Sequence, residues 1–106
     1  MKTYNYNYPV ALKEGWQTYQ EQTYCTNESH AIINLLNAGL QHIEIEPILF
    51  NPKETVSFTM KLPEPLLKRI DESKEKLGVK TRSKAIFLLI GKGLAKHQQD
   101  QNEGKE

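Results

Sequence analysis

Apolar and polar residues alternate strictly from Val56 to Leu62 in the second half of the chain. An alternation with a period of two is typical of a strand with one buried face and one face in water. Pro63 follows directly, and a proline cannot donate to a sheet ladder, so the strand is predicted to end there. We therefore expect a short amphipathic strand over 56–62.

Two helices are predicted after this strand. Leu66, Ile70 and Leu77 share one helical face, and Gly78 is suited to end that helix. Thr81 is the expected N-cap of the second helix. Its apolar stripe contains Gly93, and a glycine inside a helix costs about 1 kcal/mol relative to alanine. This glycine therefore predicts the close approach of another helix. The full stripe comprises Ile86, Leu89, Ile90, Gly93 and Leu94.

The first half of the chain follows the same plan with different residues. Tyr4, Tyr6 and Tyr8 take the apolar positions of a strand that Pro9 ends, and Asn27 is the expected N-cap of the second helix. We expect the three tyrosines in the core; stacking on single-stranded bases is the alternative. The apolar faces of the two helices comprise Leu12, Trp16, Tyr19, Ile32, Leu35, Leu36, Gly39 and Leu40.

A shift of 54 residues aligns the two halves without a gap, placing Thr3–His42 on Ser57–Lys96 with nine identities. The hydrophobic periods and helix-start signals coincide with this alignment, so we infer a duplication. One strand with two short helices cannot bury its apolar faces alone, whereas two interleaved copies can. We expect one folded unit, comprising a first repeat (1–42), an apolar linker (43–54), a second repeat (55–97) and a flexible polar tail (98–106).

A strand, a proline and two helices within about 40 residues resemble the ribbon-helix-helix family of DNA-binding proteins, to which Arc, MetJ and CopG belong. The segments 58–63 and 78–86 carry the resemblance best. It implies an α+β fold, mainly α, in which two β-α-α units pair their strands into an antiparallel ribbon that enters the major groove. Here one chain carries both units, a pseudo-dimer as in the tandem member TraY.

The resemblance assigns base reading to the polar face of the ribbon. Asparagine can pair with adenine, lysine can donate to guanine, and threonine can contact a thymine methyl group. A merely solvated strand face is the alternative. The expected base-reading residues are Thr3, Asn5, Asn7, Ser57, Thr59 and Lys61.

The starts of the second helices are expected to bind phosphate, because free N–H groups and the helix dipole favour an anion there. Simple helix capping is the alternative. Residues 54–96 carry a charge of +5 and residues 1–42 a charge of −1, so only the second repeat has a basic balance suited to DNA. The expected phosphate-binding residues are Asn27, Ser29, His30, Lys80, Thr81, Arg82, Ser83 and Lys84.

Composition and residue spacing argue against several other classes of protein, namely disulfide-bonded, catalytic, metal-binding and membrane-spanning proteins. The 106 residues have a net charge of +1, and a single cysteine, Cys25, excludes an internal disulfide. Cys25 and His30 lack the third group and oxyanion loop of a nucleophilic site, and the three histidines lack metal-ligand spacing. No apolar run is long enough to span a membrane. We expect a cytoplasmic protein that is not an enzyme and uses no cofactor or metal.

The leading hypothesis is a transcriptional repressor that binds double-stranded DNA, with self-association of further copies on the DNA as an option. An antitoxin or adaptor is the first alternative, in which the apolar segment 43–50 or the polar tail captures a partner protein. An accessory DNA-binding protein of plasmid transfer or partition is the second.

Overall fold

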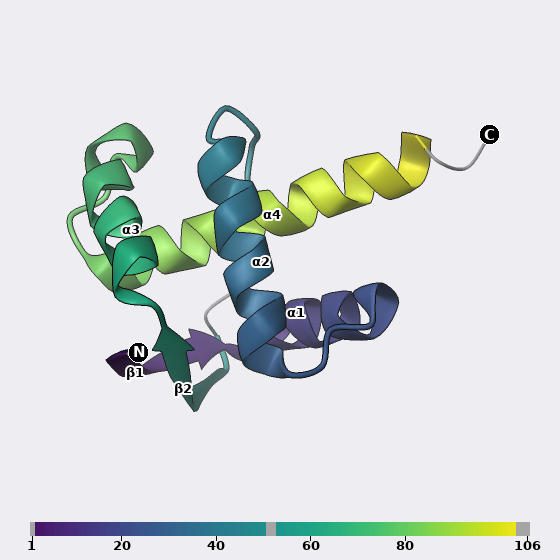
Figure 1. Ribbon diagram of the computed structural model, residues 1–106, viewed down its shortest axis with the longest axis horizontal. Coiled ribbons are helices and arrows are strands. Elements are labelled where there is room, and N and C mark those ends of the chain that lie inside the picture. Colours follow the sequence, from purple (N-terminus) through teal and green to yellow (C-terminus); the bar gives the residue numbers. More distant parts are fainter. Residues whose placement is uncertain (1, 51–52, 104–106) are drawn as a thin grey trace.

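The computed structural model describes residues 2–50 and 53–103, excepting the side chains of 2–6, 102 and 103. A two-stranded antiparallel ribbon lies along one side of the helices (Figure 1), so the predicted mainly helical α+β class is confirmed. The elements in chain order are β1 (Lys2–Pro9), α1 (Val10–Thr23), α2 (Glu28–Gln41), β2 (Thr55–Leu62), α3 (Glu64–Leu77) and α4 (Arg82–Glu103).

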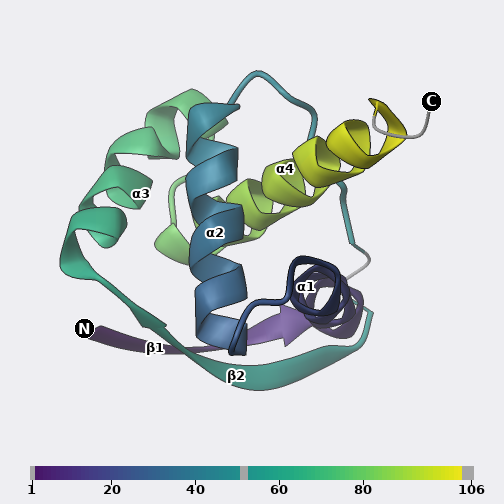
Figure 2. The same ribbon diagram turned by 45° about the vertical axis from the view of Figure 1, so that its right-hand side comes forward.

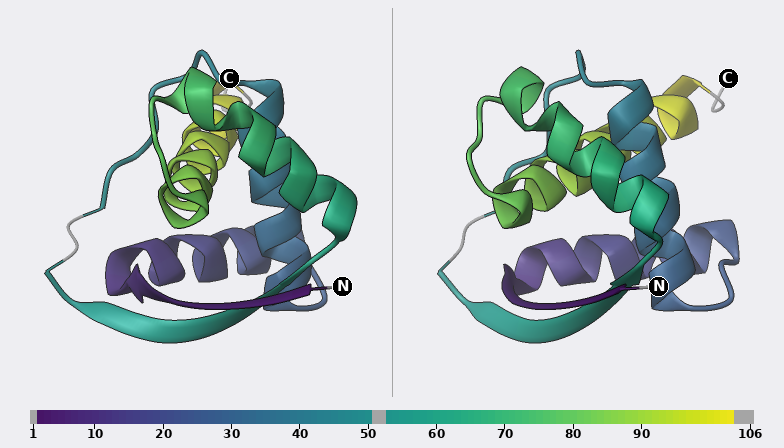
Figure 3. Two further views of the ribbon diagram at one scale, coloured as in Figure 1. Left: turned by 90° about the vertical axis from the view of Figure 1, so that its left-hand side faces the viewer. Right: turned by 60° about the vertical axis from the view of Figure 1, so that its left-hand side comes forward.

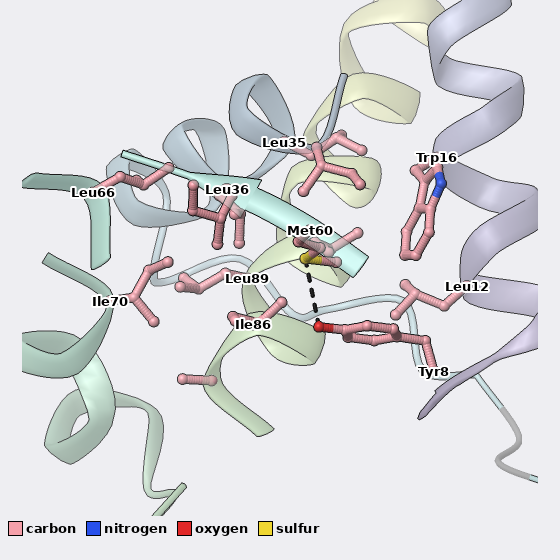
Figure 4. Close-up of a cluster of buried hydrophobic side chains, with 14 of the residues drawn as sticks. Tyr8, Leu12, Trp16, Leu35, Leu36, Met60, Leu66, Ile70, Ile86 and Leu89 are labelled. Atoms are coloured by element: carbon pink, nitrogen blue, oxygen red, sulfur yellow. Dashed lines mark hydrogen bonds between the residues drawn. The ribbon is translucent and has the colours of Figure 1, made fainter. Parts of the chain in front are cut away.

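The ribbon buries one face against the helices, as the alternation predicts. Tyr8, Met60 and Leu62 are each at most 1% exposed. The Tyr8 hydroxyl donates to the Met60 sulfur at 3.5 Å (Figure 4), which joins the two strands within the core. Tyr8 also makes edge-to-face contact with Trp16, so its predicted core position is confirmed.

The central helices α2 and α4 cross at two glycines. A methyl group on Gly39 would lie 3.0 Å from the Leu89 Cα and would overlap its carbonyl oxygen. A methyl group on Gly93 would meet the Cα and carbonyl of Leu35 in the same way. The predicted close approach of a helix at these glycines is confirmed. Figure 2 shows the crossing above the ribbon.

The linker packs along α4 and is hydrogen-bonded to it. The ammonium of Lys92, a residue that is only 8% exposed, donates to the carbonyl oxygens of Ile43 and Ile45, at 2.7 Å each. The Ile48 N–H donates to the Gly91 carbonyl at 3.1 Å. These bonds hold the linker on α4, and they explain why a buried lysine is tolerated there.

Residues 98–103 were expected in a flexible tail and instead continue α4, which corrects that boundary. Lys96 and Asp100 form an i,i+4 ion pair at 3.1 Å, which supports the helix. His97 contacts the Tyr19 ring edge-to-face, and Gln101 donates to the Gln22 side chain at 3.3 Å. The extension is thus held against α1 by residues that no repeat pattern predicted. Residues 104–106 lie outside the described part.

Candidate nucleic-acid interface

The outer face of the ribbon brings the expected base-reading positions together. In an antiparallel pair, directly opposed residues point to the same side of the sheet. The side chains of Asn7, Ser57, Thr59 and Lys61 are exposed, whereas the side chains of the other two residues lie outside the described part. The opposed pairs are Thr3 with Lys61, Asn5 with Thr59 and Asn7 with Ser57.

The inner positions of β1 are only partly described. Tyr8 is fully buried, so it offers no surface on which a base could stack. The predictions for the side chains of Tyr4 and Tyr6 lie outside the described residues.

The start of α4 has the cap that the sequence predicted. The Thr81 hydroxyl accepts a hydrogen bond from the Lys84 N–H at 3.3 Å, as an N-cap does. The side chains of Lys80 and Lys84 are exposed, and Ser83 is half-buried. The helix start therefore presents two lysines to the surroundings.

Arg82 has a protein partner in addition to its expected role toward phosphate. Its guanidinium forms a forked pair with the Asp71 carboxylate of α3, with Arg82 Nε donating to Asp71 Oδ1 at 2.9 Å and Nη2 donating to Oδ2. The hydrogen bond from Arg82 holds the pKa of the Asp71 carboxyl below its ordinary value, with smaller help from the charges of Arg82 and Lys74. The pair joins the start of α4 to α3.

The start of α2 carries its own anion. Asn27 Oδ1 accepts a hydrogen bond from the His30 N–H at 2.8 Å, so the predicted N-cap is confirmed. Glu28, in the first turn, accepts a hydrogen bond from Trp16 Nε1 at 2.8 Å. Ser29 is half-buried and His30 is exposed. A carboxylate already interacts with the positive end of this helix dipole.

The starts of α2 and α4 both lie toward the side of the molecule that carries the ribbon. Figure 3 shows that α2 and α4 both begin at their ends nearer the ribbon. The two helix starts that the sequence selected therefore lie at the ends of α2 and α4 that are nearer the ribbon (Figure 3). The two starts differ in charge, since lysines surround one and Glu28 belongs to the other.

The segment 43–50 exposes less apolar surface than its sequence indicated. Ile48 and Phe50 are partly buried and pack against the core. Leu49 is 76% exposed. The capture of a partner protein through this segment stays a prediction, with Leu49 as its most exposed apolar side chain among the described residues.

Sequence reasoning missed the internal partners of several charged residues. Glu28 accepts a hydrogen bond from Trp16, Arg82 donates to Asp71, and Lys92 donates to carbonyl oxygens of the linker. The sequence showed the positive charges of Arg82 and Lys92 and the negative charge of Glu28. No periodic signal could identify partners that lie 11 or more residues away, because such contacts depend on the tertiary arrangement.

Comparisons with protein-family models, with curated proteins and with solved structures found no match to this chain. Within residues 2–50 and 53–103, no helix combines the length and apolarity needed to cross a bilayer. The same residues contain no cluster of three or more metal-ligating side chains of the His, Cys, Asp and Glu types.

Proposed function

We propose that the chain is a sequence-specific double-stranded DNA-binding protein that places its β-ribbon in the major groove and acts as a transcriptional repressor. The observation that carries this proposal is the outer ribbon face, on which polar side chains from both strands stand in register. A two-stranded ribbon fits the major groove, where each base pair has a distinct pattern of donors and acceptors. Bound there, the protein would exclude polymerase sterically.

We further propose that the two halves form a covalent ribbon-helix-helix pseudo-dimer. The strand register supports this, because Asn5 is paired with Thr59, the residue 54 positions later. A two-fold axis through that pair would exchange the pairs on either side of it, so that Thr3 with Lys61 would be superposed on Ser57 with Asn7. The reciprocal contacts of Gly39 and Gly93 have the same symmetry, since these glycines are also 54 positions apart.

The two phosphate contacts of such a reader would be unequal. The start of α4 offers Lys80 and Lys84 to a phosphate, whereas the start of α2 offers the carboxylate of Glu28. Like charges repel, so the α4 start would provide the stronger anchor. The two strands also differ in their outer residues. We therefore expect an operator with unequal half-sites.

The test is selection from a pool of random duplex DNA at about 0.15 M salt, where charge attraction is screened beyond about 8 Å. The proposal expects enrichment of one motif with unequal halves. The absence of any enriched motif would overturn sequence-specific binding by this chain.

Two lysine variants separate base reading from general charge. Lys61→Ala should lose about 1–3 kcal/mol of discrimination at one base pair, because its ammonium faces the groove. Lys96→Ala removes the same charge at the far end of α4, where Lys96 pairs with Asp100, and should leave the motif unchanged. Equal weakening of all sequences by Lys61→Ala would assign that residue to phosphate instead of bases.

A further inference from the structure

An apolar cavity lies between the end of β1, the linker and the first turns of α4. Its volume is about 420 Å³, within the range of small-ligand pockets. Its walls are almost entirely apolar and include Pro9, Leu12, Phe50, Phe87 and Leu88. These lining residues come from the end of β1, the first turn of α1, the linker and the first turns of α4.

One cation borders this cavity. Among the described residues that line it, Lys84 is the only charged one, and its side chain is exposed. No ion-pair partner for the Lys84 ammonium occurs within residues 2–50 and 53–103 as the structure describes them. The part of the lining that the structure describes contains no carboxylate that would repel an anion. An apolar pocket that is partly open to solvent and has one lysine in its lining matches a small molecule with an apolar body and one negative end.

We propose that this cavity binds a small apolar carboxylate of the medium-chain fatty acid class. The hydrocarbon chain lies among the side chains around Leu12 and Phe87, where its burial from water drives binding. The carboxylate pairs with the Lys84 ammonium.

Binding would release DNA, a consequence that rests on the proposed function. Lys84 is one of the two exposed lysines at the α4 start, and Asn7, on the outer ribbon face, also lines the cavity. A carboxylate on Lys84 neutralises a charge that would otherwise contact phosphate, so the ligand and the DNA compete. The ligand is then an inducer of the repressor.

Decanoate, kept below its micellar concentration, is the probe for a calorimetric titration of the full chain without DNA. Each added methylene from hexanoate to decanoate should strengthen binding about fourfold, the equivalent of about 0.8 kcal/mol per buried methylene. Decyltrimethylammonium has the same chain length and the opposite charge, and it should bind at least tenfold more weakly. Equal binding of the two probes would overturn the role of Lys84.

Three variants locate the site. Lys84→Gln should weaken decanoate binding about tenfold while leaving the fold intact, because the side chain is exposed. Leu49→Asp places a carboxylate on the cavity wall at a residue that is 76% exposed, and it should abolish binding without unfolding the protein. Tyr24→Asp adds the same charge at a residue that is 91% exposed and does not line this cavity. This variant should bind decanoate with the affinity of the parent protein.

The outcomes distinguish the cavity from the DNA proposal. The cavity assignment would be overturned if the parent protein did not bind decanoate at millimolar concentration. It would also be overturned if Leu49→Asp bound decanoate as tightly as the parent. If the chain has no DNA motif, the titration still decides whether the cavity binds its ligand. If a motif is found, decanoate should weaken DNA binding by the parent at least tenfold and by Lys84→Gln less than twofold. Unchanged DNA binding at saturating decanoate would overturn the inducer role alone.

Discussion

Tyr24 and Gly78 end α1 and α3 in the same backbone conformation with different side chains. Tyr24 has φ 57° and ψ 33°, and Gly78 has φ 71° and ψ 28°. Residues with a Cβ atom lose about 1–2 kcal/mol in this left-handed region, whereas glycine enters it freely. Tyr24 is 91% exposed, so little packing offsets its strain.

Replacing Tyr24 by glycine should therefore stabilise the protein by about 1 kcal/mol, as measured by urea unfolding. Gly78→Ala is the matched reverse change. Apart from Gly78 itself and its two chain neighbours, no atom of the described residues lies within 4 Å of the added methyl group, so its expected loss of about 1 kcal/mol would report the backbone alone. A destabilised Tyr24→Gly variant would show that the tyrosine side chain has a stabilising contact.

The Asp71 and Arg82 pair should give the protein a pH-dependent contribution to stability. The folded pKa of the Asp71 carboxyl is below its ordinary value of 3.8, because the Arg82 hydrogen bond favours the ionised form. The stabilisation is therefore present above about pH 4 and is lost as the pH falls through the lower folded pKa. Both side chains are about one-third exposed, so we expect only about 0.5–1 kcal/mol.

Asp71→Asn measures this contribution. Urea unfolding at pH 7 should show the variant to be less stable than the parent by about 0.5–1 kcal/mol. The difference should shrink as both proteins are taken below pH 4. A difference that stays constant between pH 7 and pH 3 would contradict the assigned role of the carboxylate charge.

At the scale of elements, the crossing of α2 and α4 depends on the absence of side chains at two positions. Gly39→Ala would push a methyl group into the Leu89 backbone, which cannot move aside as a side chain can. Overpacking of this kind costs about 1–3 kcal/mol or more. We expect a loss of about 3 kcal/mol and a clearly lower melting temperature by circular dichroism.

Gly15→Ala is the control within α1. Its methyl group would meet only side-chain atoms, with the tip of Leu94 at 3.0 Å, and alanine has the better helix propensity by about 1 kcal/mol. We expect a change within about 1 kcal/mol in either direction. Equal destabilisation by the two variants would contradict the view that the crossing backbones set the cost.

The elements themselves follow closely from local sequence signals. Alternation marked β2, Asn27 and Thr81 marked the starts of α2 and α4, and Gly78 marked the end of α3. Each signal operates over a few residues, so it can be recognised without the tertiary structure. The continuation of α4 beyond residue 97 was not predictable in this way, since it depends on contacts with α1.

At the scale of the whole molecule, one chain supplies both strands of the ribbon and both crossing helices. A chain that supplies both halves in this way should fold as a monomer, because its second half is tethered at an effective concentration of order millimolar. Its melting temperature should stay constant over a hundredfold range of protein concentration. Sedimentation equilibrium should give the 12.2 kDa mass of one chain.

A melting temperature that rises with protein concentration would instead indicate that two chains exchange strands or helices. That result would contradict the single-chain arrangement. It would leave the ribbon register unchanged, because exchanged and unexchanged ribbons can have the same pairs.

The sequence by itself determined the class of fold, the polar face of the ribbon and the helix caps, because periodicity and capping are local properties of the chain. It also selected the glycines at which two helices approach each other. Only the tertiary structure decided that Arg82 pairs with Asp71, that Lys92 holds the linker on α4, and that an apolar cavity forms beside Lys84. These features join residues that are distant along the chain, and their contacts exist only once the elements have packed.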